Sequence, residues 1–196
     1  MQWSLYPTIA FNNPMGKVIL FMTISLDGFI NDRNGSVERL YPDLGALRKT
    51  EMLQELIKST GAVVMGRRAY DMAERDFTDY EFQVLVFVLT HHVPKKAPKG
   101  INERLTFTFV TDGIESAIAK AKAAAGERYV TVIGGASTAQ QCIKKVLLDE
   151  IQIGIMPILF IEGLRLFDHI GIEIELERIR VIESSTRTDI RFRVVK

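Results

Sequence analysis

The sequence is poor in cysteine, histidine and tryptophan and has no long apolar run, and each scarcity excludes a class of protein. Its single cysteine, Cys142, cannot form a disulfide within the chain. This excludes a small disulfide-stabilised scaffold and is typical of a reducing cytoplasm. The longest apolar stretches, at residues 83–90 and 153–161, have the length of a strand and not of a membrane-spanning helix. We therefore expect a cytoplasmic protein without a membrane segment.

Metal binding and nucleic-acid binding are not expected either. The three histidines are the adjacent His91 and His92 and the distant His169, which make a poor set of metal ligands. Lysine and arginine number 25 against 24 aspartate and glutamate residues, whereas nucleic-acid-binding domains normally carry a basic excess on one face. Residues 1–14 contain no lysine or arginine and lack the charged start of a signal peptide. We expect them to form an extension before one domain at residues 15–196.

Apolar runs and amphipathic segments alternate over the first two-thirds of the chain. Strands are predicted at residues 18–24, 62–65, 83–89, 106–110, 129–133 and 151–155, and helices at 48–58, after 112, and at 136–147. Asp112 with Glu115 three residues later has the spacing of a capping box at a helix start. This order predicts an α/β domain with a mostly parallel central sheet covered by helices on both faces.

The C-terminal quarter has a different pattern, with apolar residues at every second position. Ile172, Ile174 and Leu176 share one parity, and the alternation shifts near residues 177–178, which indicates a bulge. The alternation resumes at Ile190 and continues through Val194. An antiparallel hairpin at the edge of the sheet is therefore predicted.

Two adjacent glycines end the strand predicted at residues 129–133. Gly134 and Gly135 are followed by Ala136 and Ser137, which open the next helix. Glycine has no Cβ and lets the backbone approach a ligand closely. A helix N-terminus also offers unpaired N–H groups and the positive end of its dipole. This turn predicts an anion site, such as one for a phosphate.

A second strand end carries glycine and two cations. Gly66 is followed by Arg67 and Arg68, whose guanidinium groups match the geometry of a phosphate, and a third strand end brings Thr90 next to His91. The carboxyl ends of parallel strands meet at one edge of a sheet, where ligands bind. Several phosphate-binding groups there suit a dinucleotide with an extra ribose phosphate. The P-loop and the G-x-G-x-x-G fingerprint are absent, so neither of those folds is expected.

Taken in order, five segments resemble the dihydrofolate-reductase-like superfamily, and within it the C-terminal reductase domain of riboflavin-biosynthesis (RibD) enzymes. They are SLDGFI at 25–30, VVMGRRAY at 63–70, VLTHH at 88–92, VIGGAS at 132–137 and LLDEIQIGIMPILFIEGLRLF at 147–167. The likeness extends from about Lys17 to the C-terminus.

This resemblance implies an NADPH-dependent reductase of a small-molecule substrate, in which the cofactor supplies the hydride that no side chain can. Arg67, Arg68 and Thr90 would hold the 2′-phosphate, with Gly66 at the same turn. The glycine turn through residues 134–137 would hold the pyrophosphate. Asp27 and Glu150 would contact the substrate, whose ribosylamino chain is reduced to a ribitylamino chain in the riboflavin pathway. Family members are commonly dimers, so the resemblance also implies a homodimer.

The sequence departs from the family pattern at two positions and leaves other functions open. Ala69 replaces a threonine, and Ile161 replaces the first glycine of a G-x-G pair of which Gly163 remains. The zinc signature of the deaminase domain is absent. Dihydrofolate reduction and nucleotide binding without catalysis remain alternatives. Asp27 before Gly28 also fits an ordinary turn, and the glycine and arginine pairs also fit a tight connection and a solvated helix start.

Overall fold

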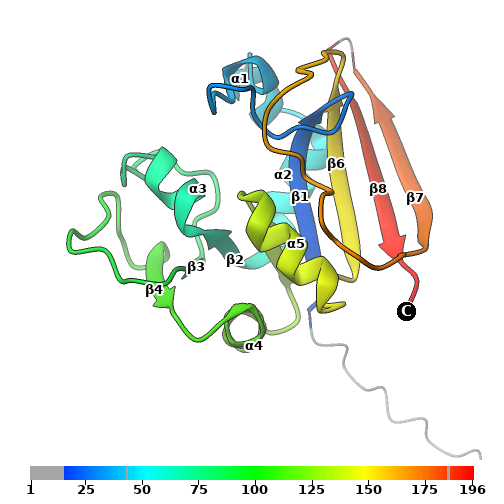
Figure 1. The fold of residues 1–196 in the computed structure, drawn as a ribbon. Helices are drawn as coiled ribbons and strands as arrows, with labels where there is room; N and C mark the ends of the chain where they lie inside the picture. Colours follow the sequence, from blue (N-terminus) through cyan, green and yellow to red (C-terminus); the bar gives the residue numbers. More distant parts are fainter. Residues whose placement is uncertain (1–15, 43, 185) are drawn as a thin grey trace, which may run out of the picture.

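The computed structural model describes residues 16–42, 44–184 and 186–196, which form one eight-stranded sheet with helices on both faces (Figure 1). The predicted extension at residues 1–14 lies outside the described residues. The strands are β1 (Val18–Ser25), β2 (Thr60–Gly66), β3 (Leu85–Leu89), β4 (Thr106–Val110), β5 (Tyr129–Ile133), β6 (Glu150–Met156), β7 (Leu176–Glu183) and β8 (Thr188–Val194). The helices are α1 (Leu44–Arg48), α2 (Glu51–Ser59), α3 (Arg67–Met72), α4 (Ile114–Ala125) and α5 (Ala136–Lys144), with a 3₁₀ turn at Glu38–Leu40.

The strand order is β4-β3-β2-β5-β1-β6-β8-β7. Strands β1 to β6 pair in parallel, and β8 runs antiparallel to both β6 and β7. The predicted fold class, a mostly parallel sheet with an antiparallel C-terminal hairpin, is therefore confirmed. The bulge lies between Arg178 and Arg180 of β7, beside the place where the apolar alternation shifts.

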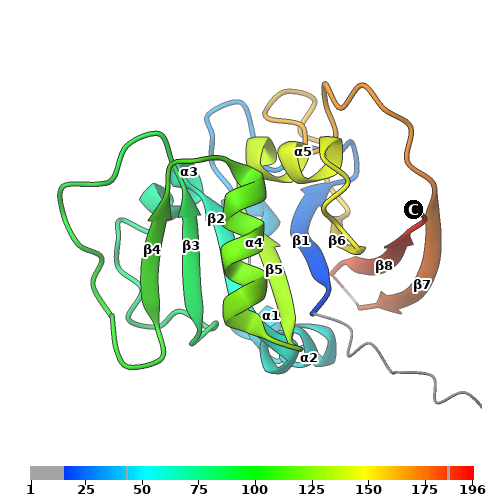
Figure 2. The ribbon, with the colours of Figure 1, turned by 90° about the horizontal axis from the view of Figure 1, so that it is seen from below.

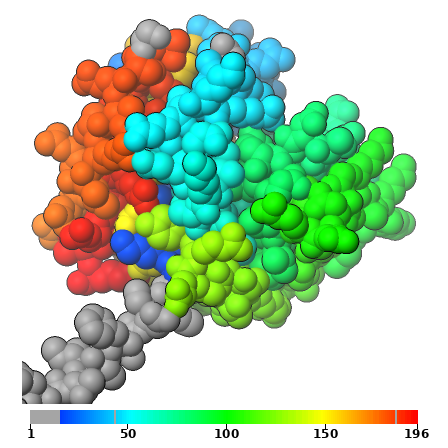
Figure 3. All heavy atoms as spheres, turned by 180° about the vertical axis from the view of Figure 1, so that it is seen from behind, coloured from blue at the N-terminus to red at the C-terminus, as the bar shows by residue number. Residues whose placement is uncertain are grey.

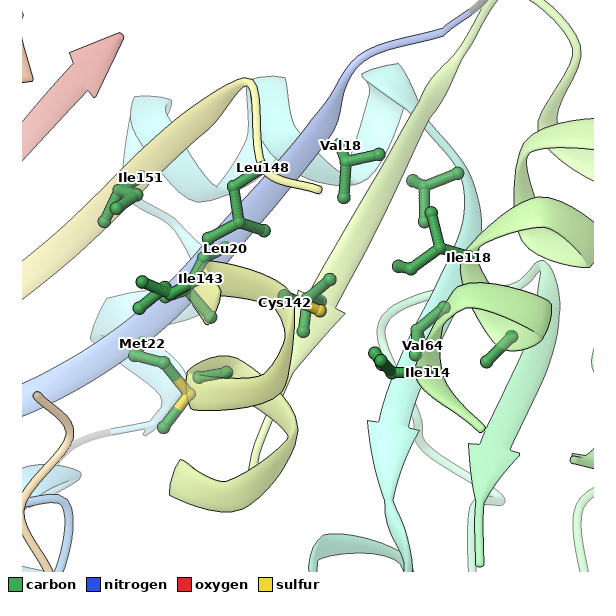
Figure 4. Close-up of a cluster of buried hydrophobic side chains, with 14 of the residues drawn as sticks. Val18, Leu20, Met22, Val64, Ile114, Ile118, Cys142, Ile143, Leu148 and Ile151 are labelled. Atoms are coloured by element: carbon green, nitrogen blue, oxygen red, sulfur yellow. The ribbon is translucent and has the colours of Figure 1, made fainter. Parts of the chain in front are cut away.

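Two hydrophobic cores, one on each face, explain why the central strands are continuous apolar runs. One core joins alternate residues of β1 to α4 and α5, and it includes Cys142 and Ile143 beside Leu20 (Figure 4). The other joins the remaining residues of β1 and β2 to α2 and α3, with Tyr70 completely buried. Figure 2 shows α4 lying along the sheet and α1 and α2 at the other side. A strand buried on both faces gains from apolar residues at every position, not at every second one.

Three predicted helix boundaries are wrong, each for a local reason. Helix α2 begins at Glu51 because the Thr50 hydroxyl accepts the Leu53 N–H, so the predicted start at residue 48 is too early. Asp112 does not cap α4; Gly113 is the cap residue, and the Asp112 carboxylate accepts hydrogen bonds from Ser116 and Lys120 instead. Helix α5 ends at Lys144, before residue 147, because the chain turns through a positive φ of 53° two residues later.

The C-terminal hairpin is shorter than predicted and forms the edge of the sheet. Ile172 and Ile174 precede β7 and are not in a strand, because the chain still crosses towards the edge there. Of the described strands, β7 pairs with β8 alone, and its side chains are mostly exposed. Figure 3 shows these strands, in orange and red, beside the cyan helices α1 and α2 that cover the middle of the sheet.

Candidate functional site

A cleft of about 600 Å³ lies where the parallel strands end, and we call it the strand-end cleft. It is lined by the residues that follow β2, β3, β4 and β5, including Gly66, Thr90, Thr111 and Gly135. Parallel strands place their carboxyl ends at one edge, so segments far apart in the sequence meet there. Of the predicted site residues, the structure brings Gly66, Arg67, Arg68, Thr90, Gly135, Ala136 and Ser137 into this one cleft.

The turn before α5 favours glycine at both positions because of its backbone conformation, and at Gly134 also because of the space around it. Gly134 and Gly135 have φ of 76° and 81°, in the left-handed region that favours glycine. A Cβ on Gly134 would lie 2.6 Å from the Ala69 Cβ, and one on Gly66 would lie 2.5 Å from the Thr138 hydroxyl. The turn therefore brings the N-termini of α3 and α5 into close contact.

Among the described residues, no side chain caps the N-terminus of α5. Gly135 is the cap residue, and its carbonyl accepts the first intrahelical bond, from the Ala139 N–H. Helix geometry leaves the N–H groups of the first turn, at Ala136, Ser137 and Thr138, without intrahelical acceptors. These three residues line the strand-end cleft, so an anion bound there would lie near backbone donors at the positive end of a helix dipole.

Arg67 is held in place by its neighbours at the end of β3. Its Nη1 donates to the His92 carbonyl oxygen at 2.8 Å and to the Thr90 hydroxyl at 3.4 Å, and its Nε pairs with Asp71 at 2.8 Å. Thr90 is buried and donates to the same carbonyl of His92. The guanidinium group is therefore oriented before any ligand arrives, which lowers the entropic cost of binding an anion.

Arg68 differs from Arg67 because its exposed side chain has no hydrogen-bond or ion-pair partner among the residues that the structure describes. Its guanidinium group lies near the loop after β1, since a Cβ added to Gly35 would be 3.8 Å from its Nη2. Arg68 lines both the strand-end cleft and a second cavity. Its charge is thus available to a ligand at the place where the two cavities meet.

The second cavity, which we call the inner cavity, has a volume of about 200 Å³ and a mostly apolar lining. Its apolar walls come from β1, β5, α3 and two loops: Phe21, Met22, Ile30, Val37, Met72, Ile133 and Leu164. Asn31, Tyr41 and Arg68 are its larger polar side chains. The inner cavity and the strand-end cleft share Arg68, Gly135 and Leu164, so the glycine turn lies between them. A flat ring would fit the inner cavity while a charged chain extends along the cleft.

Asp27 lines neither cavity, and its carboxylate holds two loops together. It accepts hydrogen bonds from the Ser25 hydroxyl at 2.5 Å, from the Ile161 N–H at 2.8 Å and from the Phe160 N–H at 3.1 Å. Desolvation alone would raise its pKa, but these donors outweigh it and lower the pKa of Asp27 to about 2. The bonds fix the segments that carry Asn31 and Leu164, both in the wall of the inner cavity.

Glu150 is not brought to this site. It opens β6 beside Ile19, six residues before the end of β1 at Ser25, which is roughly 20 Å along the strand. Its buried carboxylate pairs with Lys17 at 2.6 Å and with Arg191 Nε at 2.6 Å. A buried carboxylate with two cationic partners has the environment of a structural ion pair.

Sequence reasoning missed most of the inner cavity. Its apolar residues follow the same patterns as core residues, and Asn31 and Tyr41 lie in a loop without a recognisable motif. Only the tertiary structure brings them together. The described residues contain no group of three His, Cys, Asp or Glu side chains placed to hold a metal ion. Nor do they include a helix both long and apolar enough to cross a membrane.

A family model for the RibD C-terminal domain matches residues 16–189. The chain belongs to this family. An uncharacterized Bacillus subtilis protein, YyaP, is 27% identical over 172 residues, which cover 83% of this chain and 86% of that protein. The family explains why the five short segments occur in this order, and the resemblance seen in the sequence is confirmed.

Solved structures share the fold of this RibD C-terminal domain at low identity. A protein of Shewanella sp. PV-4 assigned to riboflavin biosynthesis has a TM-score of 0.76 and 24% identity, with 92% of this chain and 99% of that chain covered. A Thermotoga maritima deaminase and 5-amino-6-(5-phosphoribosylamino)uracil reductase has a TM-score of 0.65 and 13% identity, with 92% and 57% covered. Enterococcus faecalis dihydrofolate reductase, in complex with NADP(H), has a TM-score of 0.62 and 17% identity, with 93% and 98% covered. The dihydrofolate-reductase-like fold is therefore established.

Proposed function

We propose that this protein is an NADPH-dependent reductase whose cofactor lies in the strand-end cleft with its nicotinamide at the inner cavity. The observation that carries the proposal is the meeting of two unlike cavities at one glycine turn, one with phosphate-binding groups and one with apolar walls. A dinucleotide has the same division into a charged chain and a flat ring. The E. faecalis protein, which shares this fold, is in complex with NADP(H).

The residues present fit such a cofactor. Arg67 and Thr90 would hold the 2′-phosphate at the end of β3, and Arg68 with the N–H groups at Ala136 and Ser137 would hold the pyrophosphate. The cofactor, when bound, supplies a hydride. The chain's own contribution is to orient the ring against the substrate and to exclude water with the apolar residues of the inner cavity.

The reduction of 5-amino-6-(5-phosphoribosylamino)uracil, named for the T. maritima protein, is the first reaction to test. Titration calorimetry with NADPH tests the cofactor, and the loss of NADPH absorbance at 340 nm tests turnover. We expect NADPH to bind and at least one carbonyl or imine compound to be reduced. A protein that binds neither NADPH nor NADH would refute the proposal.

Nucleotide binding without catalysis is the second candidate, and one observation favours it. Among the residues that the structure describes, the lining of the inner cavity contains no aspartate, glutamate or histidine that could deliver a proton. Asp27 lies outside this lining, and its carboxylate accepts the backbone N–H groups of Phe160 and Ile161. In a reductase the proton would then come from solvent. Tight NADPH binding with no turnover on any pteridine or aminopyrimidine would favour this candidate.

We also propose that the protein forms a two-fold homodimer through its C-terminal strands. Among the strands that the structure describes, β7 has one unpaired edge, and its Leu176, Ile179 and Val181 are each at least 40% exposed. An exposed edge with apolar side chains favours pairing with another chain. Two copies of β7 related by a two-fold axis would cover both edges at once.

A further inference from the structure

A further cavity lies between the region of α1 and the turn that joins β7 to β8, and we call it the side cavity. It has a volume of about 210 Å³. Its walls are the apolar Leu40, Pro42, Ala46, Leu47 and Met156 and the polar Tyr41, Thr50, Ser184, Thr186 and Arg187. None of these residues lines the strand-end cleft. A ligand in the side cavity would therefore leave the proposed cofactor site open.

Tyr41 connects the side cavity to the inner cavity, because it lines both. Burial raises the pKa of its phenol, whereas the Thr23 hydroxyl and the charge of Arg187 act in the opposite direction. Thr23 lies two residues after Phe21 on the same face of β1, and Phe21 lines the inner cavity. The two cavities thus meet at Tyr41, close to Thr23 and Arg187.

Arg187 is the only charged residue that lines the side cavity within the part of the chain described. Its side chain is 6% exposed. Its Nε donates to Asp189 Oδ2 at 2.8 Å, and its Nη2 donates to Asp189 Oδ1 at 2.6 Å. Its Nη1 donates to the buried Thr23 hydroxyl at 3.4 Å. The guanidinium group is therefore held in one orientation beside β1.

Gly154 gives this ion pair its space. Gly154 lies on β6 between Thr23 of β1 and Asp189 of β8. A Cβ on Gly154 would lie 2.9 Å from Asp189 Oδ1 and 3.1 Å from Arg187 Cζ. Because glycine has no Cβ, the ion pair packs directly against the sheet. The backbone of β6 thus fixes where the guanidinium group lies.

Arg187 has more N–H groups than acceptors. A guanidinium group carries five N–H groups, and the bonds to Asp189 and Thr23 use three of them. The other two, one on each terminal nitrogen, have no acceptor among the described residues. Buried donors nearly always have a partner, so unused donors on a residue that lines a cavity indicate a ligand oxygen.

Asp189 determines which kind of oxygen is favoured. Its carboxylate is 4% exposed and pairs with the guanidinium group through both oxygens, so the pair carries no net charge. A bound anion would be attracted to Arg187 but repelled by Asp189, and it would lose its hydration. A neutral carbonyl oxygen accepts the same hydrogen bonds and loses much less hydration.

We propose that the side cavity binds a neutral carbonyl or amide group, to whose oxygen Arg187 donates hydrogen bonds. This inference rests on the reductase function proposed above for the role of the ligand, which is the end of the substrate that lies beyond Tyr41. It narrows the substrate class to compounds with a lactam, urea or amide group at that end. Arg187 is then a specificity-determining residue, which disfavours a carboxylate or phosphate in the same place.

Benzamide and benzoate are a matched pair of probes, because they have nearly the same shape and differ in charge. We expect benzamide to bind at least about tenfold more tightly when each is titrated into the protein without cofactor and followed by the amide NMR signals of the protein. The largest shifts should lie at Leu47, Thr50 and Thr186, which line the side cavity and not the inner cavity. Equal affinities, tighter binding of benzoate, no binding of benzamide, or shifts centred on the inner cavity would overturn the inference.

A second titration separates the side cavity from the cofactor site. Saturating NADP⁺ should change the affinity for benzamide less than about twofold, because the two sites are distinct. Competition between NADP⁺ and benzamide would overturn the inference. The NADPH titration tests the proposed function and the benzamide titration without cofactor tests the side cavity, so each can fail independently of the other.

A double variant assigns the effect to the ion pair. Arg187→Met with Asp189→Leu removes both charges, and such apolar replacements of a buried pair are often neutral for stability. The affinity for benzamide should fall at least about tenfold. Arg193→Met with Glu177→Gln removes an exposed ion pair of the same strand β8 and is the control, which should keep the affinity. Unchanged affinity in the first variant, or an equal loss in both, would overturn the inference.

Arg187→Lys is the milder variant if the double variant does not fold. Lysine keeps a positive charge beside Asp189 but lacks the planar fork, so the affinity for benzamide should fall about threefold or more. A folded Arg187→Lys protein with unchanged affinity would refute the contact with Arg187.

Discussion

Gly135→Val is the sharpest test of the strand-end cleft. Gly135 has φ of 81° and ψ of 114°, and a residue with a Cβ held in that sparsely populated conformation costs roughly 1–3 kcal/mol of stability. The Cβ itself would fit, since its nearest neighbours are the Thr138 hydroxyl at 3.6 Å and the Gly66 Cα at 4.0 Å. The loss is small against the roughly 5–15 kcal/mol that holds a domain together, so the variant should fold. Its melting temperature should fall by roughly 2–12 °C.

The Gly135→Val variant should lose affinity for NADPH although it still folds. Branched methyl groups at Gly135 would extend over the N–H groups at Ala136 and Ser137, where the pyrophosphate must approach. We expect at least about a tenfold loss of affinity, or 1.4 kcal/mol, in titration calorimetry. A folded Gly135→Val protein with the affinity of the unmodified protein would show that the turn serves packing alone.

Variants at two other glycines show whether a loss of NADPH affinity comes from backbone strain or from the position in the cleft. Gly126 has φ of 62° and open space around its Cβ position, but it caps the far end of α4. Gly126→Val should therefore lose similar stability and keep NADPH affinity. Gly134→Val adds a collision with Ala69, so its stability should fall further than that of Gly135→Val. Loss of NADPH affinity in the Gly126 variant would mean that strain, and not the position in the cleft, explains the effect.

Four further predictions concern charge, the loops and assembly. We expect the unmodified protein to bind NADPH more tightly than NADH, with a difference that salt reduces. Replacing Arg67 and Arg68 by alanine should remove most of this preference. Equal affinities of the unmodified protein for NADPH and NADH would refute the assignment. Asp27→Asn should lower turnover more than NADPH affinity. With a pKa of about 2 against the usual 3.8, Asp27 stabilises the fold above about pH 4 and loses this effect as pH falls towards 2, so acid unfolding of the asparagine variant should lack that component. Ile161→Gly should resist denaturant better by up to about 1 kcal/mol, because it relieves a φ of 67° at a largely exposed side chain. Light scattering should give twice the mass of one chain, and a monomer at micromolar concentration would end the dimer proposal.

The fold was predictable because its strands have one physical requirement. A strand buried on both faces needs apolar residues throughout, and the central strand β5 has the bounds that the sequence predicts, Tyr129–Ile133. The edge strand β4 also has its predicted bounds, Thr106–Val110, although it is mostly half-buried. The helix ends were harder, because several side chains compete for each one. Asp112 has the right type and spacing for a cap, yet its carboxylate is taken by Ser116 and Lys120. Pattern alone does not say which donor is closer.

The candidate site also has a part that the sequence predicted and a part that it did not. The strand-end cleft and the turn beside it consist of local motifs, in which Gly66 with Arg67 and Gly134 with Gly135 are neighbours in sequence. The inner cavity depends on side chains such as Phe21 and Leu164, and the sequence does not distinguish these from other core residues. Glu150 shows that a motif residue can also lie away from the cleft. It stands at the start of β6, not at the end where the cleft lies, and its carboxylate pairs with Lys17.

Ile161, in the loop that hydrogen-bonds to Asp27, replaces a glycine of the family pattern but keeps the backbone conformation of a glycine. Ile161 has φ of 67°, the left-handed conformation that a glycine would adopt at this position. The Asp27 carboxylate accepts the Ile161 N–H and compensates for the strain of the side chain. Gly163 has no such substitute, because a Cβ there would collide with the Asn31 carbonyl oxygen in the wall of the inner cavity. The first glycine of the pair is thus replaceable where the second is not, and Asp27 acts on the inner cavity by positioning its walls.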